Sequence, residues 1–536
     1  MRALISVFYK TGLVEAVSKL VVRGCEDIVS SGGTAAELQK AGISVAEVSD
    51  VTGFPEILDG RVKTLHPRIH GPILAKRTPD HEAQLIVHKM ERIDLVCVDL
   101  YPFEETIAKP DATHDDIVEK IDIGGVALLR AAAKNYENTL VLASIADLLA
   151  WIEKGMPQDV ETRRKLAAKA FAVTRQYDSA IACYMSKGQY DRMGGERSLI
   201  CKYGENPWQE GAAFFRTMGV HDPLGLDKFM LVTGDKPSYN NLLDLNWLLQ
   251  IMTHAVAGFE TNFGPRHGSI ALGVKHTNVC GAGESNDPTI AIQKMRDGDR
   301  ENLFGGLVMF NFPLTAKLVD LFPVHQTPSG EVRMLDGVFA PEVSPEALRM
   351  LERKGGKCRV MVNPALAHLG VESLDAAPQF RSVRGGSLQQ PNYTFVLNLK
   401  DPQLIVHCGA LGLRESEDLE FAWAVGSPAN SNTIIIMKDR MVIGSGVGQQ
   451  GRKLAAKLAV MRARDAGHEA MLLGAVAYSD SFFPFPDGPQ VLVEAGIRTI
   501  FASRGSRNDE AVINFCKEAG ITFVTMPDKV CRGFRH

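Results

Sequence analysis

Four short segments near the start of the chain carry side chains suited to binding an anion and moving protons. Residues 30–34 read Ser-Ser-Gly-Gly-Thr between an apolar run and a helical pattern, so backbone N–H groups and the helix dipole could hold a phosphate there. Residues 61–67 supply two cations and a hydroxyl, residues 99–103 a phenol beyond a strand end, and residues 121–125 a carboxylate beside two glycines. Open α/β sheets bind ligands at such strand ends.

Each of these side chains also has a purely structural explanation. Thr34 could cap a helix, and Lys63 and Lys134 could be solvated charges. Tyr101 could be an anchored core phenol, and Asp122 an N-cap. Any one of these explanations would be preferred for a single residue. The occurrence of four such segments in one region favours a binding site.

A second candidate site begins at residue 275. Residues 275–281 read Lys-His-Thr-Asn-Val-Cys-Gly after the apolar run 269–274. A Lys-His pair at a strand end presents a cation and a titratable base, which suits proton transfer combined with stabilisation of a developing negative charge. A lone His in this place is more often merely hydrogen-bonded, so this motif needs support from others.

Two other classes of site are excluded by spacing. A zinc deaminase needs H-x-E followed by P-C-x-x-C, and neither occurs. Residues 444–448, Gly-Ser-Gly-Val-Gly, lack the G-x-G-x-x-G register of a dinucleotide loop and are interpreted as a substrate or cation loop. The nine cysteines form no C-x-x-C pair, which indicates a reduced compartment and no structural zinc.

The elements that must position these residues alternate along the chain in an α/β pattern. In the first part, the expected strands are residues 4–8, 27–30, 94–100 and 139–144, and the expected helices are 12–22, 34–41, 126–135 and 161–185. A polar, glycine-rich linker is expected at residues 187–196. Further strands are expected at residues 269–274, 307–310, 433–437, 470–477 and 499–502.

Length and composition indicate an ordinary soluble protein of more than one domain. The chain has 536 residues, 45% hydrophobic and 23% charged, with a formal net charge of −4. That charge gives no global attraction for nucleic acid or a membrane surface. The apolar run at the N-terminus is too short for a signal peptide or a membrane span. A cytoplasmic protein is therefore expected.

The first set of motifs resembles the IMP cyclohydrolase domain of the AICAR transformylase/IMP cyclohydrolase family of purine biosynthesis. The resemblance lies in residues 31–34, 61–67, 100–103 and the block 122–135, and it continues in order to Phe534-Arg535-His536. It implies a methylglyoxal-synthase-like parallel-sheet domain at residues 1–195. A transformylase domain built of cytidine-deaminase-like α/β units is implied at residues 196–536.

The resemblance also implies the residues of the first site. Lys63, Tyr101, Asp122 and Lys134 are expected to be catalytic, with Lys63 stabilising the formyl oxygen as the ring closes. The expected substrate ligands are Lys10, Ser31, Gly33, Thr34, Arg61, Thr64, Gly124 and Gly125.

The second set of motifs lies where the transformylase family carries its substrate-lining segments. By that resemblance His276 accepts the proton of the attacking amine, Lys275 stabilises the oxyanion and Asn432 holds the formyl group. The other expected substrate ligands are Lys202, Tyr203, Asn241, Gly305, Arg452, Asp480 and Phe482.

The chain departs from the family pattern at several positions. In the first site, Phe8 and Tyr9 replace a Ser-Asp pair, and Asp99 replaces an Asn. In the second, Lys202 and Pro486 each stand for an Arg, Trp208 for a His and Val279 for a Pro. Because lysine lacks the planar fork of arginine, we expect a weaker ribotide-phosphate clamp in the second site.

The activity implied by the family is the last two steps of IMP synthesis. The formyl group of 10-formyltetrahydrofolate passes to AICAR, and the product FAICAR closes to IMP with loss of water. A homodimer with shared transformylase sites and a bound potassium ion are further expectations from the family, with no zinc. Two alternatives stay open at this point: a cyclohydrolase whose second domain has lost transformylase activity, and a non-catalytic sensor of purine nucleotides.

Overall fold

The computed structural model describes residues 1–533 except 59, 191–193, 218–220, 266–267, 323–324, 327–331, 334 and 353–354. The chain divides into two compact units, Met1–Gly195 and Glu196–His536. Residues 191–193 of the expected linker and the terminal Phe534-Arg535-His536 lie outside the described residues. No helix of the described part is long and apolar enough to cross a membrane.

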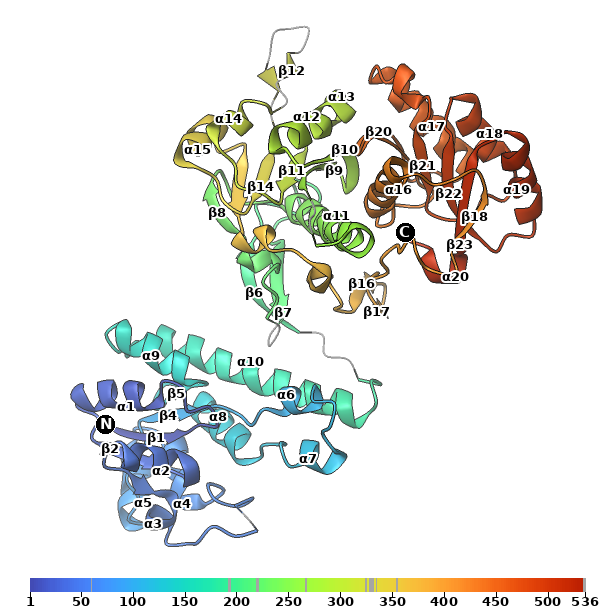
Figure 1. Ribbon diagram of the computed structural model, residues 1–536. Coiled ribbons are helices and arrows are strands. Elements are labelled where there is room, and N and C mark those ends of the chain that lie inside the picture. The colour runs from blue at the N-terminus through green and yellow to red at the C-terminus, as the bar shows by residue number, and fades with distance from the viewer. Residues whose placement is uncertain are drawn as a thin grey trace. The chain divides into compact units, whose positions relative to one another are not determined.

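The first unit is built on a five-stranded parallel sheet in the order β3-β2-β1-β4-β5 (Figure 1). Its strands are β1 (Arg2–Ser6), β2 (Asp27–Ser30), β3 (Ala46–Glu47), β4 (Leu95–Val98) and β5 (Leu140–Leu142). Its helices are α1 (Leu13–Val22), α2 (Gly32–Lys40), α3 (Val48–Thr52), α4 (Pro67–Leu74), α5 (Pro79–Val87), α6 (Phe103–Ile107), α7 (His114–Val118), α8 (Gly124–Lys134), α9 (Ile145–Glu153) and α10 (Val160–Met185).

Alternate residues of these strands enter two separate cores. Leu4 and Val96 pack with α8 and α10 on one face, whereas Ile5 and Cys97 pack with α1 and α9 on the other. A parallel sheet buried on both faces explains why its strands read as continuous apolar runs in the sequence. The expected strands and helices of this unit are present, with ends shifted by one or a few residues.

The second unit contains a twelve-stranded mixed sheet in the order β18-β23-β22-β21-β19-β20-β10-β9-β11-β14-β15-β8. Its first six strands along the chain are β8 (Met230–Thr233), β9 (Ser269–Lys275), β10 (Asn278–Ser285), β11 (Leu307–Phe310), β14 (Gly337–Ala340) and β15 (Arg359–Val362). The other six are β18 (Ile405–Cys408), β19 (Ile434–Lys438), β20 (Met441–Gly446), β21 (Val476–Ser479), β22 (Thr499–Arg504) and β23 (Thr522–Pro527).

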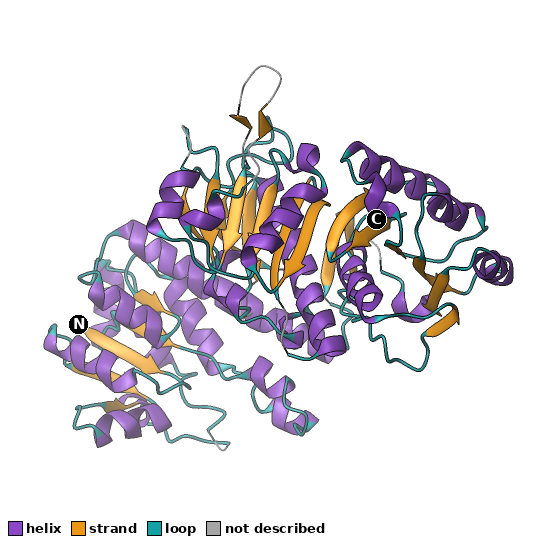
Figure 2. Cartoon of the chain, turned by 45° about the horizontal axis from the view of Figure 1, so that its top comes forward, coloured by secondary structure: helices purple, strands orange, loops and turns teal. Residues whose placement is uncertain are grey.

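This sheet consists of two six-stranded halves with the same topology. In each half, counted outward from the junction, the first two strands form an antiparallel hairpin (β10-β9 or β20-β19), and the third strand is antiparallel to the second. The fourth strand runs parallel to the third and the fifth runs parallel to the fourth, whereas the edge strand is antiparallel to the fifth. The halves meet through one residue pair, Gly283 with Met441. Figure 2 shows the strands of both halves with helices packed against them. Two repeated α/β units therefore make up this sheet.

Helices cover both faces of the twelve-stranded sheet. On one face α11 (Tyr239–Phe263) and α16 (Leu413–Gly426) pack against each other within a single core. The main helices of the other face are α12 (Pro288–Gly298), α15 (Pro345–Leu351), α17 (Arg452–Asp465), α18 (Asp487–Glu494) and α19 (Asp509–Glu518). Shorter elements are α13 (Arg300–Leu303), α14 (Ala316–Val319), α20 (Asp528–Cys531) and the two-stranded pairs β6–β7 (Gly195–Ile200, Ala213–Thr217), β12–β13 (His325–Gln326, Val332–Arg333) and β16–β17 (Gln379–Val383, Gly386–Gln390).

The sequence-based assignment of the second unit was right for four of the five strands it named. Residues 470–477 were expected to be one strand, but residues 469–472 form a 3₁₀ turn and β21 begins at Val476. Gly474 lies between them with a φ of 72°. An apolar composition alone does not distinguish a buried turn from a strand, and this positive φ ends the extended run.

Candidate active sites

The first candidate site is a cavity of about 740 Å³ at the carboxyl edge of the parallel sheet. Because β1, β2 and β4 are parallel, the residues that follow Ser6, Ser30 and Val98 meet at this edge. Eleven of the twelve residues predicted for this site line the cavity: Lys10, Ser31, Gly33, Thr34, Arg61, Lys63, Thr64, Tyr101, Asp122, Gly124 and Gly125.

One end of the cavity is suited to a phosphate. Ser31 is the N-cap of α2, and its hydroxyl lies 3.0 Å from that of Ser6. The Lys10 ammonium donates to the Thr34 hydroxyl at 2.9 Å, and burial lowers the Lys10 pKa. The start of a helix, three hydroxyls and a lysine therefore lie together at this end.

The other end gathers a cation, a carboxylate and a phenol. The Lys63 ammonium pairs with Glu56 Oε2 at 3.0 Å. The Asp122 carboxylate accepts the Gly125 N–H at 2.7 Å, and burial raises its pKa. A Cβ on Gly125 would lie 2.5 Å from Asp122 Oδ2, so glycine is required for this close approach. The Tyr101 side chain is 41% exposed and borders the same cavity.

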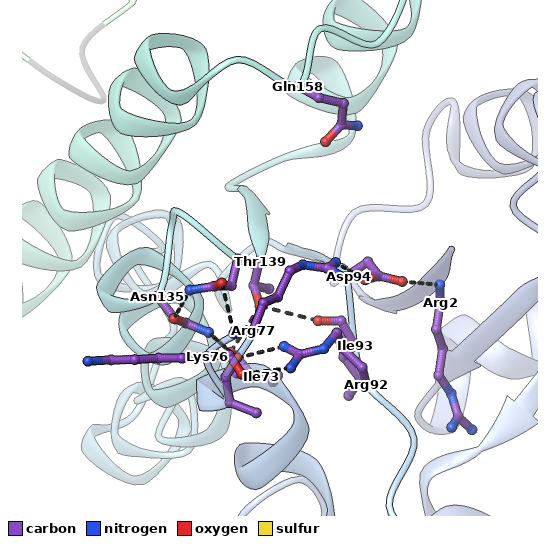
Figure 3. A network of polar contacts seen from close by, with 12 residues as sticks. Arg2, Ile73, Lys76, Arg77, Arg92, Ile93, Asp94, Asn135, Thr139 and Gln158 are labelled. Carbon is purple, nitrogen blue, oxygen red and sulfur yellow. Dashed lines mark hydrogen bonds and ion pairs between the residues drawn. The ribbon is translucent and has the colours of Figure 1, made fainter. Parts of the chain in front are cut away.

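Lys134 is the predicted residue that the structure does not bring to this cavity. It ends α8, whose first turn holds Gly124 and Gly125, and a helix rises about 1.5 Å per residue, or about 14 Å over nine residues. Its neighbour Asn135 donates to the carbonyls of Ile73 and Ala75 at 2.8 and 3.0 Å. Figure 3 shows this polar network together with Arg2, where β1 begins. Lys134 thus lies at the opposite edge of the sheet from the site, which corrects its assignment to this cavity.

The three departures from the family pattern in this unit contact one another. The Asp99 carboxylate accepts hydrogen bonds from the backbone N–H groups of Phe8 and Tyr9. Burial raises the Asp99 pKa to about 6. The Phe8 ring packs edge-on against Tyr101 with ring centroids 5.9 Å apart, and Phe8 lines the cavity. An aromatic side chain therefore lines the cavity at the position where the family pattern predicted a serine hydroxyl.

The second candidate site lies along one edge of the twelve-stranded sheet. Strand β9 ends there at Lys275, and its antiparallel neighbour β11 begins there just after Gly305. Since β20 runs antiparallel to β10, it ends at this edge, where α17 then starts with Arg452. Strand β19 is antiparallel to β20 and therefore begins at this edge, just after Asn432. Strand β21 is antiparallel to β19 and therefore ends at this edge, just before Asp480. Strand direction alone thus gathers the predicted transformylase residues at one edge.

Lys275 and His276 form one group at this edge. The Lys275 ammonium donates to the Phe304 carbonyl at 2.8 Å, next to Gly305. A Cβ on Gly305 would lie 4.0 Å from that ammonium, and the φ of Gly305 is 71°. His276 is exposed in the turn between β9 and β10.

Asn432, Arg452 and Asp480 form a second group, held together by direct contacts. The Arg452 guanidinium pairs with the fully buried Asp480 and donates to Asn432 Oδ1. The Asn432 amide donates to the Gln449 carbonyl at 2.8 Å. Phe482 follows two residues after Asp480, with the Arg532 guanidinium 5.7 Å from its ring centroid. Two strands, β10 and β20, separate the first group from the second, and these two strands pair only through Gly283 and Met441, at the opposite edge of the sheet.

The N-terminal turn of α11 places the remaining predicted residues. Asn241 closes a capping box with Ser238, which fixes the start of this helix. Tyr239 donates its backbone N–H to the Tyr203 carbonyl at 3.0 Å. The ammonium of Lys202 pairs with Asp235 Oδ2 at 2.7 Å. Lys202 is thus near the expected site, with an acidic partner of its own.

The other departures in this unit have different surroundings. Trp208 is 78% exposed, whereas Val279 is buried in the core on β10. Pro486 is the residue before α18. Residues 444–446 belong to β20, and a Cβ on Gly444 or Gly446 would lie 2.4 or 2.0 Å from carbonyl oxygens of α17. Gly444 and Gly446 therefore serve close helix packing within a strand, which corrects their interpretation as part of a loop, whereas Val447 and Gly448 follow the strand.

Sequence reasoning missed several residues that hold these sites. Glu56 pairs with Lys63, and the Tyr177 hydroxyl accepts a hydrogen bond from the Asp122 N–H at 2.9 Å. Asp244 accepts the Thr277 N–H beside His276. Tyr177 and Asp244 act across 55 and 33 residues of sequence, so no local motif marks them. Helix α11 carries several other polar residues, so nothing in its local sequence singles out Asp244.

Fold and sites together define a two-unit α/β enzyme with a separate candidate active site in each unit. Two family profiles match the chain: the MGS-like domain at residues 12–127 and the AICARFT/IMPCHase bienzyme at residues 132–462. The chain therefore belongs to the AICARFT/IMPCHase bienzyme family. It is a bifunctional enzyme with transformylase and cyclohydrolase activities.

Individual relatives agree over the full length. Proteins named bifunctional purine biosynthesis protein PurH from Deinococcus radiodurans and Chloroflexus aurantiacus are each 38% identical, covering 100% of this chain and 99% of the relative. The protein of the same name from Deinococcus deserti is 37% identical with the same coverage. A solved structure titled "Crystal structure of ForH" is 32% identical and covers 35% of this chain and 99% of that one, with a TM-score of 0.32.

Proposed function

We propose that Met1–Gly195 closes FAICAR to IMP and that Glu196–His536 transfers the formyl group from 10-formyltetrahydrofolate to AICAR. The observation that carries this division is that the predicted cyclohydrolase residues line a cavity of the first unit. The predicted transformylase residues all belong to the second unit. Each unit therefore has its own set of groups for charge stabilisation and proton transfer.

In the first unit, the carboxamide nitrogen attacks the formyl carbon and a new C–N bond forms. The formyl oxygen leaves as water after it takes one proton from the attacking nitrogen and one from the formamide nitrogen. Lys63 is assigned to the negative charge that develops on this oxygen. Asp122 and Tyr101 are assigned to the proton transfers, and burial of Asp122 makes its carboxylate the stronger proton acceptor. Lys10, Ser31 and Thr34 would hold the phosphate.

In the second unit, the AICAR amine attacks the formyl carbon of the folate. The C–N bond to the folate nitrogen then breaks, and that nitrogen receives a proton in place of the one lost by the amine. His276 is assigned as the acceptor of the amine proton, and Lys275 as the cation beside the oxyanion. Asn432, held by Arg452, would orient the formyl group.

The separation of the two groups in this site fits two substrates better than one small ligand. Each group belongs to a different half of the sheet, so that a ribotide and a folate would meet between them. We further propose that the enzyme is a homodimer, as the family implies, with a partner subunit completing this edge. Sedimentation of the purified protein, alone and with both substrates, tests the oligomeric state.

Two half-assays on the full chain test the proposed function. FAICAR alone should be converted to IMP, and AICAR with 10-formyltetrahydrofolate should be converted to FAICAR and onward. Conversion of FAICAR without formylation of AICAR would instead select a cyclohydrolase with an inactive second unit. Binding of purine ribotides with neither reaction would select a nucleotide sensor.

A further inference from the structure

The turn that carries His276 has an unusual backbone. His276 and Thr277 connect β9 to β10 as a two-residue hairpin, with φ values of 53° and 61°. Such turns favour Asn and Gly at both positions, because side chains with a Cβ are disfavoured in the left-handed region. A β-branched Thr is especially unfavourable there. Contacts from outside the turn must therefore hold it.

Asp244 supplies the outside contact. Its side chain, on α11, is only 5% exposed, and its Oδ1 accepts the Thr277 N–H at 2.6 Å. The backbone N–H of His276 also stabilises the charged carboxylate against the burial that raises the Asp244 pKa. Asp244 thus ties the turn to the first part of α11, three residues after Asn241 on the same helix face.

The other half of the sheet contains the same arrangement. Asp439 and Arg440, with φ values of 49° and 56°, connect β19 to β20. Asp418, on α16, accepts their N–H groups at 3.1 and 2.5 Å. Asp244 and Asp418 are each the sixth residue of their helix, counted from Tyr239 and Leu413. Two repeated units therefore use a buried Asp to hold a left-handed hairpin turn.

The repeat extends to the lysine before each turn. Lys275 ends β9 and donates to the Phe304 carbonyl at 2.8 Å, whereas Lys438 ends β19 and donates to the Gly474 carbonyl at 2.9 Å. Each carbonyl lies just before the third strand of its half. Only the first copy carries a His in its turn, at the edge with the other predicted transformylase residues. The second copy lies at the opposite edge, since β19 runs away from Asn432.

We propose that Asp244 is a positioning residue for formyl transfer, which holds the backbone of the 275–277 turn so that His276 and Lys275 keep their places relative to the ribotide amine. This inference rests on the proposed function of the second unit. It assigns Asp418 the same structural task without a catalytic one. The internal repeat therefore provides a matched control within the same chain.

The test compares Asp244→Asn with Asp418→Asn in the full-length protein. Both changes remove a buried carboxylate that accepts hydrogen bonds from a left-handed turn, so similar losses of thermal stability are expected. Misplacement of catalytic groups by about 1 Å can cost ~10²-fold in rate. D244N should therefore lower kcat for formyl transfer by about that factor, with little change in the ribotide KM. D418N should leave formyl transfer close to wild type, and both variants should retain FAICAR cyclisation.

A rescue experiment separates positioning from direct chemistry. Thr277→Gly removes the Cβ that disfavours the left-handed turn, so the turn depends less on Asp244. In the D244N background T277G should restore part of the lost kcat, whereas a carboxylate that itself moves a proton would not be replaced. Equal loss of transfer in D244N and D418N, a wild-type rate in D244N, or failure of T277G to rescue would each overturn the inference. Absence of formyl transfer in the wild-type protein would instead refute the proposed function.

Discussion

The carboxylate of Asp99 accepts a hydrogen bond of 3.3 Å from the backbone N–H of Tyr9, which lies 90 residues earlier in the chain. The resemblance to the family leads us to expect a carboxylate at position 9 and an amide at position 99, whereas this chain has Tyr9 and Asp99. The Asp99 charge also favours the protonated form of Lys10. A carboxyl group at position 99 thus lies beside Lys10 at the phosphate end of the cavity.

The Asp99 contact predicts a pH-dependent stability. Burial raises the Asp99 pKa from 3.8 to about 6 in the folded protein. Between these pH values the folded state binds more protons than the unfolded chain, so the stability that this group contributes is lost as pH rises through 6. The Tm of Asp99→Asn relative to that of wild type should therefore be higher at about pH 7.5 than at about pH 5. Thermal melts at the two pH values measure this, and an equal difference at both would contradict it.

Removal of a catalytic residue of the first site should separate the two activities. Lys63→Ala or Asp122→Ala should lower FAICAR cyclisation by about 10²–10⁴-fold, because charge stabilisation or proton transfer is lost. Formyl transfer should be unchanged, since neither residue belongs to the second unit. Purified variants would be compared in the two half-assays. Equal loss of both activities in a folded protein would argue against separate sites.

Lys134 provides a matched comparison with Lys63. Both were expected to be catalytic from the sequence, but Lys134 is exposed at the far end of α8. Lys134→Ala should therefore leave the kcat for cyclisation within about 3-fold of wild type, as surface substitutions usually have small effects. A loss of kcat as large as that of K63A, with an unchanged melting temperature, would show that Lys134 takes part in the reaction.

The second site should bind the ribotide phosphate more weakly than a site that uses arginine side chains. Lys202 is a point charge already paired with Asp235, and Pro486 has no donor where the family has an Arg. Pro486→Arg should lower the ribotide KM, and Lys202→Ala should raise it. Steady-state kinetics at saturating 10-formyltetrahydrofolate measures both. An unchanged KM after loss of Lys202 would remove that residue from the phosphate pocket.

His276 is the residue on which formyl transfer should depend most. The AICAR amine is a poor nucleophile because its lone pair is delocalised, so a positioned base should contribute about 10²–10⁴-fold. His276→Ala should lower the single-turnover transfer rate by that factor and change ribotide affinity much less. A near-wild-type rate would exclude His276 as the base. Parallel loss of cyclisation would indicate misfolding of the variant.

Much of the first site could be predicted from the sequence by itself. Apolar runs identified β1, β2 and β4, and parallel strands bring their carboxyl ends to one edge. Short motifs directly after those runs therefore had to meet, whatever the details of packing. The same reasoning found Lys275-His276, because a strand end followed by a cation and a base is a local pattern.

Tertiary structure alone decided which residues of a motif face the site and which distant residues hold it. Lys134 shares a motif with Asp122, yet the length of α8 carries it to the opposite edge. The glycines at 444 and 446 resembled a loop but allow α17 to pack closely on β20. Asp244 and Asp418 reach turns 33 and 21 residues away. Local sequence encodes local conformation, whereas such contacts depend on strand register and helix packing, which arise only when the chain folds.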